Sequence, residues 1–209
     1  MGATACCWAG STVLIPLQNM QSSTRWDGMG KIIGSIGAIV SRNRIIVSLL
    51  LGGALWFLSR PTLLSIAAGA PFVILGEAIR TWSSGHIRKN QELATTGPYA
   101  FTRNPLYLGS GMMGFGFILM GRSWGLLLLF LMFFALIYHF TILREEEKLS
   151  ARFGSQFSAY AESVPRFFPR WSAWRQVETG FDWGLVLKHR EHRTWLGIVV
   201  ILALMMIRM

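Results

Sequence analysis

Residues 124–143 read WGLLLLFLMFFALIYHFTIL, a stretch that contains no Asp, Glu, Lys or Arg. A helix needs roughly 20 residues to cross the hydrocarbon core of a bilayer, which is about 30 Å thick. This stretch reaches that length, and it lacks the polar residues every three or four positions that a water-exposed helix carries. It therefore predicts a transmembrane helix.

Four further apolar runs accompany this one: Ile45–Leu58, Leu63–Ile79, Leu106–Met120 and Leu196–Ile207. They are shorter, so Trp, Ser and Arg residues at the membrane interface must complete each span. One such run could be the buried core helix of a soluble protein, but five in a chain of 209 residues leave too few polar faces to cover them. We predict an all-α integral membrane protein with about five transmembrane helices in short hairpins and a cytoplasmic C-terminal segment.

The positive charge follows this topology. The formal net charge is +10, yet only Arg60, Arg122 and Arg208 fall on the face opposite to the other basic residues of the predicted bundle. The positive-inside rule then places the segments Arg80–Asn104 and Arg144–Thr194 in the cytoplasm. Anionic membrane lipids are sufficient partners for this charge, so we expect no nucleic-acid partner, and we predict a location in a bacterial inner membrane.

The chain has the length of one domain. Residues 1–43 carry Gly, Ser and scattered charge, and we predict a mobile or interfacial lead-in before a membrane domain at 44–209. The two cysteines, Cys6 and Cys7, are sequence neighbours, so they neither staple a fold nor supply a metal site. We expect no bound metal.

Asn104-Pro105 marks the start of the third apolar helix, with a side-chain N-cap followed by Pro at the first helical position. The free N–H groups at such a start suit an anion, for example the carboxylate of an amino-acid-like ligand. Capping alone is the simpler interpretation. Four glycines follow within the helix and favour close approach of another helix or of a flat ligand: Gly109, Gly111, Gly114 and Gly116.

A dense charge cluster, Arg144-Glu145-Glu146-Glu147-Lys148, follows the longest apolar run. Such a cluster is usually a solvated helix face. Adjacent carboxylates beside an arginine could instead hold a sulfonium or ammonium ligand, because the arginine keeps them ionised at pH 7.

Four pieces of the chain together resemble the isoprenylcysteine carboxyl methyltransferase and phospholipid methyltransferase superfamily in order and spacing: TGPYAFTRNPLYLG (96–109), REEEKLSARFG (144–154), Tyr160 and VPRFFP (164–169). The resemblance covers residues from about 76 to 170. It implies a helical bundle in which a cytoplasmic segment caps S-adenosylmethionine, without any metal.

The resemblance also implies roles for particular residues. Arg144 would face the methyl acceptor, and Glu145 would act with it in catalysis. The cofactor would be bound by the following residues: Tyr99, Arg103, Asn104, Pro105, Tyr107, Gly109, Glu145, Glu146, Tyr160 and Arg166.

One position departs from the family pattern, because Asn104 stands where the family commonly has His. An Asn side chain donates and accepts hydrogen bonds but cannot take a proton. A mechanism that uses this position only for a hydrogen bond is therefore favoured over one that needs a base there. His86 and His139 are the other possible bases, although isolated histidines are more often structural.

The predicted reaction is methyl transfer from S-adenosylmethionine to a lipid-like or prenylated acceptor that enters from the bilayer. An isoprenylcysteine-like carboxylate would need no base and could be gripped by Arg144. Three alternatives remain: a phospholipid N-methyltransferase, an NADPH-dependent membrane reductase of the sterol-reductase type, and a non-catalytic scaffold. The sequence leaves the acceptor and the oligomeric state open.

Overall fold

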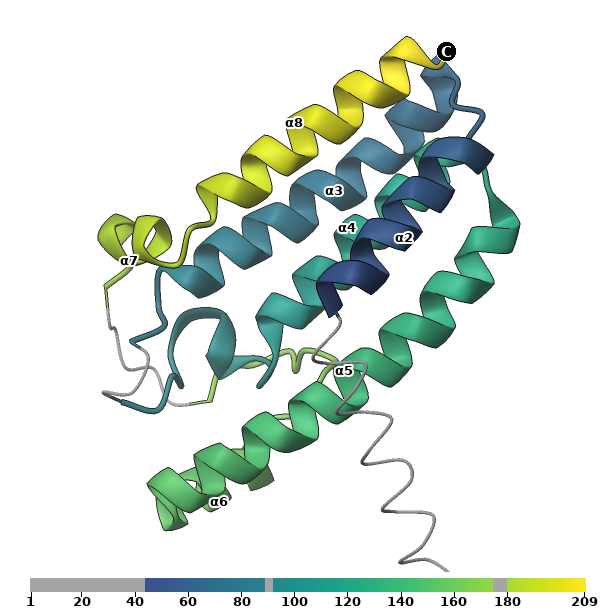
Figure 1. Cartoon of the computed structure of the whole chain (residues 1–209). Coiled ribbons are helices and arrows are strands. Elements are labelled where there is room, and N and C mark those ends of the chain that lie inside the picture. The colour runs from purple at the N-terminus through teal and green to yellow at the C-terminus, as the bar shows by residue number, and fades with distance from the viewer. Residues whose placement is uncertain (1–43, 89–91, 175–179) are drawn as a thin grey trace, which may run out of the picture. The chain divides into compact units, whose positions relative to one another are not determined.

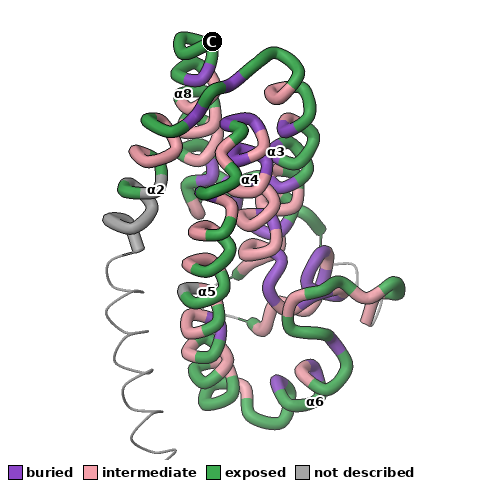
Figure 2. Tube along the Cα trace, turned by 90° about the vertical axis from the view of Figure 1, so that its right-hand side faces the viewer, coloured by how far each residue is buried: buried purple, intermediate pink, exposed green. Residues whose placement is uncertain are grey.

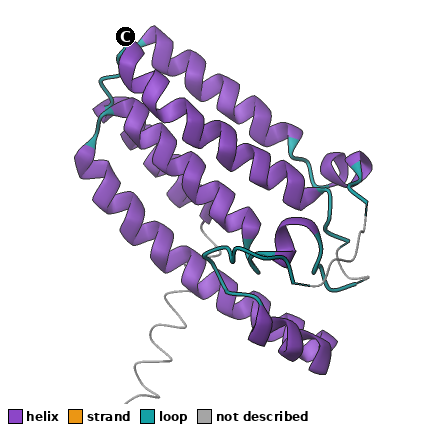
Figure 3. Cartoon of the chain, turned by 180° about the vertical axis from the view of Figure 1, so that it is seen from behind, coloured by secondary structure: helices purple, strands orange, loops and turns teal. Residues whose placement is uncertain are grey.

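A computed structural model describes residues 44–88, 92–174 and 180–209, and all regular structure in these ranges is helical. The predicted lead-in at 1–43 lies outside the described residues. Figure 1 shows the long helices side by side, and Figure 3 shows the connecting loops gathered at their ends. The helices are α2 (Arg44–Leu58), α3 (Leu63–Ser84), α4 (Pro105–Gly121), α5 (Trp124–Phe153), α6 (Ser155–Ser163), α7 (Trp183–Lys188) and α8 (His192–Ile207), with a 3₁₀ turn, η2, at Gly97–Ala100.

Each of the five predicted apolar runs forms a helix. By length and composition α3 and α5 could each cross a membrane, whereas α4 and α8 are shorter apolar helices. Much of the outer surface of the described bundle is exposed in Figure 2, and it carries large apolar side chains such as Leu64, Leu128 and Val199, which are 81%, 74% and 62% exposed. Such a surface suits hydrocarbon better than water. The number of spans and the cytoplasmic orientation stay predictions.

The helix α5 is longer than its apolar run. It continues through Arg144 and the glutamates to Phe153, where Gly154 follows with a left-handed φ of 49°. The charge cluster is therefore helical, and its side chains project from successive faces of the last turns of α5.

The helix ends sort into two groups. One end of the bundle holds the α2–α3 turn, where Arg60 N–H donates to the Gly121 carbonyl (2.9 Å) and the Arg208 guanidinium donates to the Ser59 carbonyl (3.1 Å). Thr62 and Ser65 form a capping box at the start of α3. The other end of the bundle holds the long polar segments, and the candidate site lies there.

Glycines let α3 and α4 pack backbone against backbone. A Cβ atom added at Gly76 would lie 2.5 Å from the Gly109 carbonyl oxygen, and one added at Gly116 would lie 2.8 Å from the Gly69 carbonyl oxygen. Gly111 and Gly114 of α4 face α5, since Cβ atoms there would meet the rings of Phe134 and Phe130. The packing interpretation of the glycines is confirmed: they leave room for neighbouring helices.

We expect Gly76→Ala to destabilise the detergent-solubilised protein by about 1–3 kcal/mol, because two helix backbones must separate to admit the methyl group. Gly197→Ala in α8 is the matched control, since nothing lies within 4 Å of the added Cβ atom. It should be neutral or stabilising, because Ala favours helix over Gly. Thermal unfolding measures both, and equal midpoints would contradict the tight α3–α4 packing.

Candidate active site

Two segments far apart in sequence are joined by backbone hydrogen bonds at the polar end of the bundle. Arg103 N–H donates to the Pro165 carbonyl, Arg170 N–H to the Phe101 carbonyl and Trp174 N–H to the Ala100 carbonyl, each at 3.0 Å. The structure therefore brings residues 100–103, from the first of the two predicted polar segments, against residues 165–174 of the second. Residues 164–174 lie directly against this stretch, which precedes α4.

Side chains strengthen this junction. Thr102 Oγ1 donates to the Phe167 carbonyl (2.9 Å), and Asn104 Nδ2 donates to the Arg166 carbonyl (2.8 Å). The predicted side-chain N-cap by Asn104 is wrong, because no cap hydrogen bond forms and the amide is turned toward residue 166 instead. The position of Pro105 as the first residue of α4 is confirmed. Asn104 thus ties the VPRFFP segment to the start of α4.

Glu146 forms the electrostatic centre of the site. Its Oε1 atom lies 3.1 Å from Arg103 Nη1, and it accepts hydrogen bonds from Arg166 Nε (3.0 Å) and Nη2 (2.7 Å) on its two oxygens. The side chains of Arg103 and Glu146 are largely shielded from solvent. The hydrogen bond to Glu146 raises the pKa of the Arg166 guanidinium, so this fork stays charged. One carboxylate on α5 therefore holds both loop segments.

Glu145 has a different partner. The Tyr107 hydroxyl on α4 donates to Glu145 Oε1 (2.8 Å), and the Tyr107 ring packs edge-on against Tyr138, with 4.7 Å between the ring centroids. Phe134 continues this aromatic row, 4.1 Å from Tyr138 and 6.3 Å from Phe167. Sequence reasoning missed this row, although the spacing of Phe130, Phe134 and Tyr138, four residues apart, places them on one helix face.

Two buried tyrosines lie beside the charged cluster. Tyr160 Oη donates to the Tyr99 carbonyl (2.8 Å). Burial raises the pKa of both phenols well above their ordinary range, and the negative charge of Glu145 adds to the shift of Tyr99, so both remain protonated donors. Tyr99 Oη and Arg103 Nε are buried and, within the described ranges, have no hydrogen-bond partner. These two donors therefore lack an acceptor within the part of the chain that the structure describes.

The remaining predicted residues are distributed more widely. Arg144 is partly buried on α5, one residue before Glu145, and Gly109 faces Gly76 on α3. His86 packs beside Gly97, and its Nδ1 atom lies 2.9 Å from the Trp82 carbonyl oxygen, which is a structural role. His139 is exposed on α5.

A cavity of about 530 Å³, a volume typical of small-molecule sites, lies beside Trp174, and the predicted cofactor-binding residues are not among those that line it. Trp174 forms part of its wall and packs at a tilt of 54° against Tyr160, with 5.3 Å between the ring centroids. The polar lining comes from His86 just after α3, from Glu92, Thr95 and Thr96 before η2, and from the start of α6. The cavity can therefore offer both a flat aromatic surface and hydrogen-bonding groups.

The chain is similar to one protein family and to two curated proteins. A family model described as phospholipid methyltransferase matches residues 47–156, which include η2, α4 and the glutamate cluster. The nickel-cobalt-cadmium resistance protein NccN of Alcaligenes xylosoxydans xylosoxydans is 33% identical over 139 residues, which are 65% of this chain and 64% of that protein. The cobalt-zinc-cadmium resistance protein CzcN of Cupriavidus metallidurans is 34% identical over 139 residues, which are 65% and 63%.

The chain thus spans a little less than two thirds of the length of these curated relatives. No solved structure matches the chain. Within the part of the chain that the structure describes, no group of three or more His, Cys, Asp and Glu residues is arranged to hold a metal ion.

The hydroxyl of Tyr160 gives a test of the site. Tyr160→Phe should cost about 1–3 kcal/mol of unfolding free energy, because the buried Tyr99 carbonyl loses its donor. Burial raises the pKa of Tyr160 in the folded protein above the value near 10 of a phenol in the unfolded chain. The stabilisation of the fold by protonated Tyr160 is therefore complete below about pH 10 and is lost as the pH rises above that value.

The variant should therefore lose stability less steeply than the wild type above about pH 10. Thermal unfolding in detergent between neutral and alkaline pH measures this difference. Parallel curves would contradict a buried, protonated Tyr160.

Proposed function

Because the chain belongs to the phospholipid methyltransferase family, we propose that it transfers a methyl group from S-adenosylmethionine to a lipid-like acceptor that enters from the bilayer. Membership of this family implies a methyltransferase. The observation that carries the proposal for this chain is the cluster around Glu146, which joins the 96–109, 144–154 and 164–169 segments. The exposed apolar faces of α3, α5 and α8 would give the acceptor its route from the membrane.

The residues present fit the cofactor. S-adenosylmethionine carries a carboxylate, ribose hydroxyls and ring nitrogens that accept hydrogen bonds. The buried donors Tyr99 Oη and Arg103 Nε have no acceptor within the described chain, and the cofactor would supply one. The cavity beside Trp174 offers an aromatic surface for a nucleoside. Glu145 supplies a carboxylate for the positive end of the ligand.

When bound, S-adenosylmethionine supplies an electrophilic methyl group on a positively charged sulfur. The chain itself supplies position and a fixed electrostatic environment. Tyr107 holds Glu145 in one orientation, and Glu146 holds the VPRFFP segment through Arg166. The aromatic row at Phe134 and Tyr138 packs against the Tyr107 ring and so supports this orientation of Glu145.

The acceptor we favour is a carboxylate of the isoprenylcysteine type. Such a group is already a nucleophile and needs no base, which agrees with the use of Asn104 as a structural tie to the Arg166 carbonyl. Arg144 would orient the acceptor, because a guanidinium binds a carboxylate through two parallel hydrogen bonds. The cytoplasmic orientation of the site is part of this proposal.

A second candidate is N-methylation of a phospholipid amine, which the description of the matched family favours. An amine acceptor must lose a proton during the reaction, so it requires a base that the carboxylate acceptor does not. The family match supports both transfers over the NADPH-dependent reduction that sequence reasoning kept as an alternative.

Calorimetry on the detergent-solubilised protein should show binding of S-adenosylmethionine and none of NADPH. Methyl transfer should then be measured with a labelled donor and two acceptors, a prenylcysteine analogue and phosphatidylethanolamine. Labelling of the prenylcysteine analogue supports the carboxylate acceptor, and labelling of phosphatidylethanolamine supports the second candidate. Cofactor binding without any turnover would support a non-catalytic scaffold, and tight NADPH binding would overturn the assignment.

The glutamates make a sharper test. Glu145→Gln and Glu146→Gln should each weaken S-adenosylmethionine binding by about tenfold or more, because a hydrogen bond to a charged group is worth roughly 1.5–3 kcal/mol. Glu145 would lose its bond to the cofactor, and Glu146 would lose its hold on the Arg103 and Arg166 segments that form the site. Glu147→Gln is the matched control, since Glu147 is the exposed neighbour in the same turn of α5 and should bind as the wild type does. Equal affinity in all three variants would remove the site assignment.

Arg144→Lys separates the acceptor from the cofactor. Lysine keeps the charge but loses the planar fork, so we expect turnover to fall while the dissociation constant of S-adenosylmethionine stays near the wild-type value. Unchanged turnover in a folded variant would exclude Arg144 from acceptor binding.

A further inference from the structure

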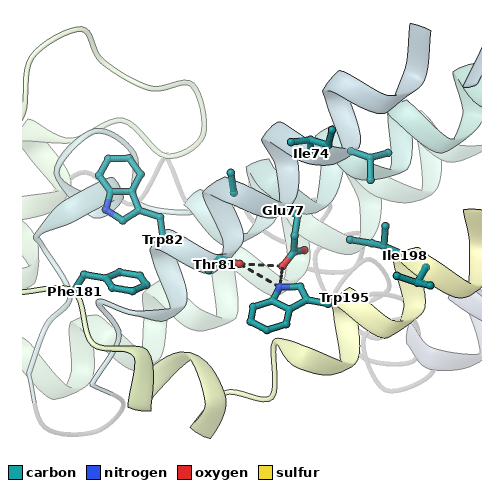
Figure 4. Close-up of a pocket in the computed structure, with 10 residues that line it drawn as sticks. Ile74, Glu77, Thr81, Trp82, Phe181, Trp195 and Ile198 are labelled. Atoms are coloured by element: carbon teal, nitrogen blue, oxygen red, sulfur yellow. Dashed lines mark hydrogen bonds between the residues drawn. The ribbon is translucent and has the colours of Figure 1, made fainter. Parts of the chain in front are cut away.

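A second hollow lies between α3 and α8, and it shares no residue with the candidate active site. Its volume is about 610 Å³, and most of its wall is apolar. Figure 4 shows Ile74 of α3 and Ile198 of α8 along the hollow, with Trp82 and Phe181 toward the polar end. Ile74 and Val199 are exposed, so the hollow opens onto the outer, apolar surface of the bundle.

A carboxylate lies inside this apolar groove. Glu77 Oε1 accepts hydrogen bonds from Trp195 Nε1 (2.7 Å) and Thr81 Oγ1 (3.1 Å), as drawn in Figure 4. The other oxygen, Oε2, is buried and has no hydrogen-bond partner in the described chain. An ionisable group within an apolar helix is costly to keep and points to a binding function.

The nearby guanidinium does not neutralise Glu77 fully. Arg80 Nη2 lies 3.0 Å from both oxygens of Glu191, and Arg80 Nη1 donates to Ser110 Oγ. The closest approach of Arg80 to Glu77 is 3.8 Å, from Nε to Oε2, without a hydrogen bond. One cation therefore lies near two carboxylates, and its hydrogen bonds go to Glu191 and Ser110. The hydrogen bonds that Glu77 receives come from neutral donors alone, Trp195 and Thr81.

We propose that this groove binds a membrane amphiphile with an ammonium head. Its chain lies against Ile74, Ile198 and Val199, and the ammonium group pairs with the Glu77 carboxylate. Glu77 is seven residues before the end of α3 at Ser84, which is about 10 Å along the helix at 1.5 Å per residue. A head group from the membrane interface reaches that depth when its chain follows the groove. The inference does not depend on methyl transfer.

The test uses the full chain in a non-ionic detergent and two photoreactive probes of equal chain length, an alkylamine and the matching alkyl alcohol. Mass spectrometry locates the label and gives the apparent affinity for the groove from the concentration dependence. We expect the amine to label α8 with about tenfold or more higher affinity than the alcohol, as a charged hydrogen bond requires. Labelling without this preference would overturn the proposal.

Two variants and a control complete the experiment. Glu77→Gln should reduce amine affinity to that of the alcohol, and the exposed Glu162→Gln on α6 should leave it unchanged. Val199→Phe fills the groove from an exposed position while Glu77 stays intact, so it should weaken labelling by both probes, even if Glu77→Gln fails to fold. Retained amine preference in folded Glu77→Gln, or undiminished labelling in Val199→Phe, would refute the site.

Occupation of the groove by a second copy of the chain would also refute it. In that case the wild type would resist both probes, and Val199→Phe would convert a dimer to a monomer in size-exclusion chromatography.

Discussion

The contact between α3 and α4 fixes the positions of both sites. Gly69 faces Gly116 and Gly76 faces Gly109, so the two backbones approach more closely than any larger residue would allow. This contact sets the height of Arg80 on α3 relative to Ser110 on α4, which share a hydrogen bond. It also fixes where α3 ends and α4 begins, and therefore where the segment between them can meet the rest of the chain. Helix association in lipid relies on such close packing, because apolar side chains gain little by leaving hydrocarbon.

The candidate active site is made from irregular chain that this frame holds in place. The approach to α4 and the VPRFFP segment bind each other through backbone groups, so their pairing does not depend on particular side chains. Glu146 then adds a charged link from α5 to both segments through Arg103 and Arg166. A carboxylate that joins three segments in this way can order a ligand-binding surface at a membrane boundary, where the burial of apolar side chains stabilises the chain only weakly.

The sequence predicted the helices well, because an apolar run of sufficient length is a local signal. It did not predict that α5 continues to Phe153. The charges after Leu143 end the apolar run, but the helix continues through them. Asn104 was misread for a related reason. A side chain before a helix is expected to cap it, but here a carbonyl 62 residues away in sequence competes successfully for the amide. The aromatic row on α5 was visible in the spacing, whereas its packing against Tyr107 and Phe167 depends on the fold.

Two carboxylates, Glu146 and Glu77, illustrate how the surroundings of a charge indicate its use. Glu146 has two guanidinium partners near the polar end of the bundle, so its charge stabilises the contact between two segments of the chain. Glu77 lies in an apolar groove with hydrogen bonds from neutral donors only, and one of its oxygens has no partner among the described residues. A structural role would be served better by a neutral side chain at that depth, because burying an incompletely paired charge is unfavourable. The groove is therefore better explained as a place where a positive ligand completes the set of hydrogen bonds than as a part of the packing between α3 and α8.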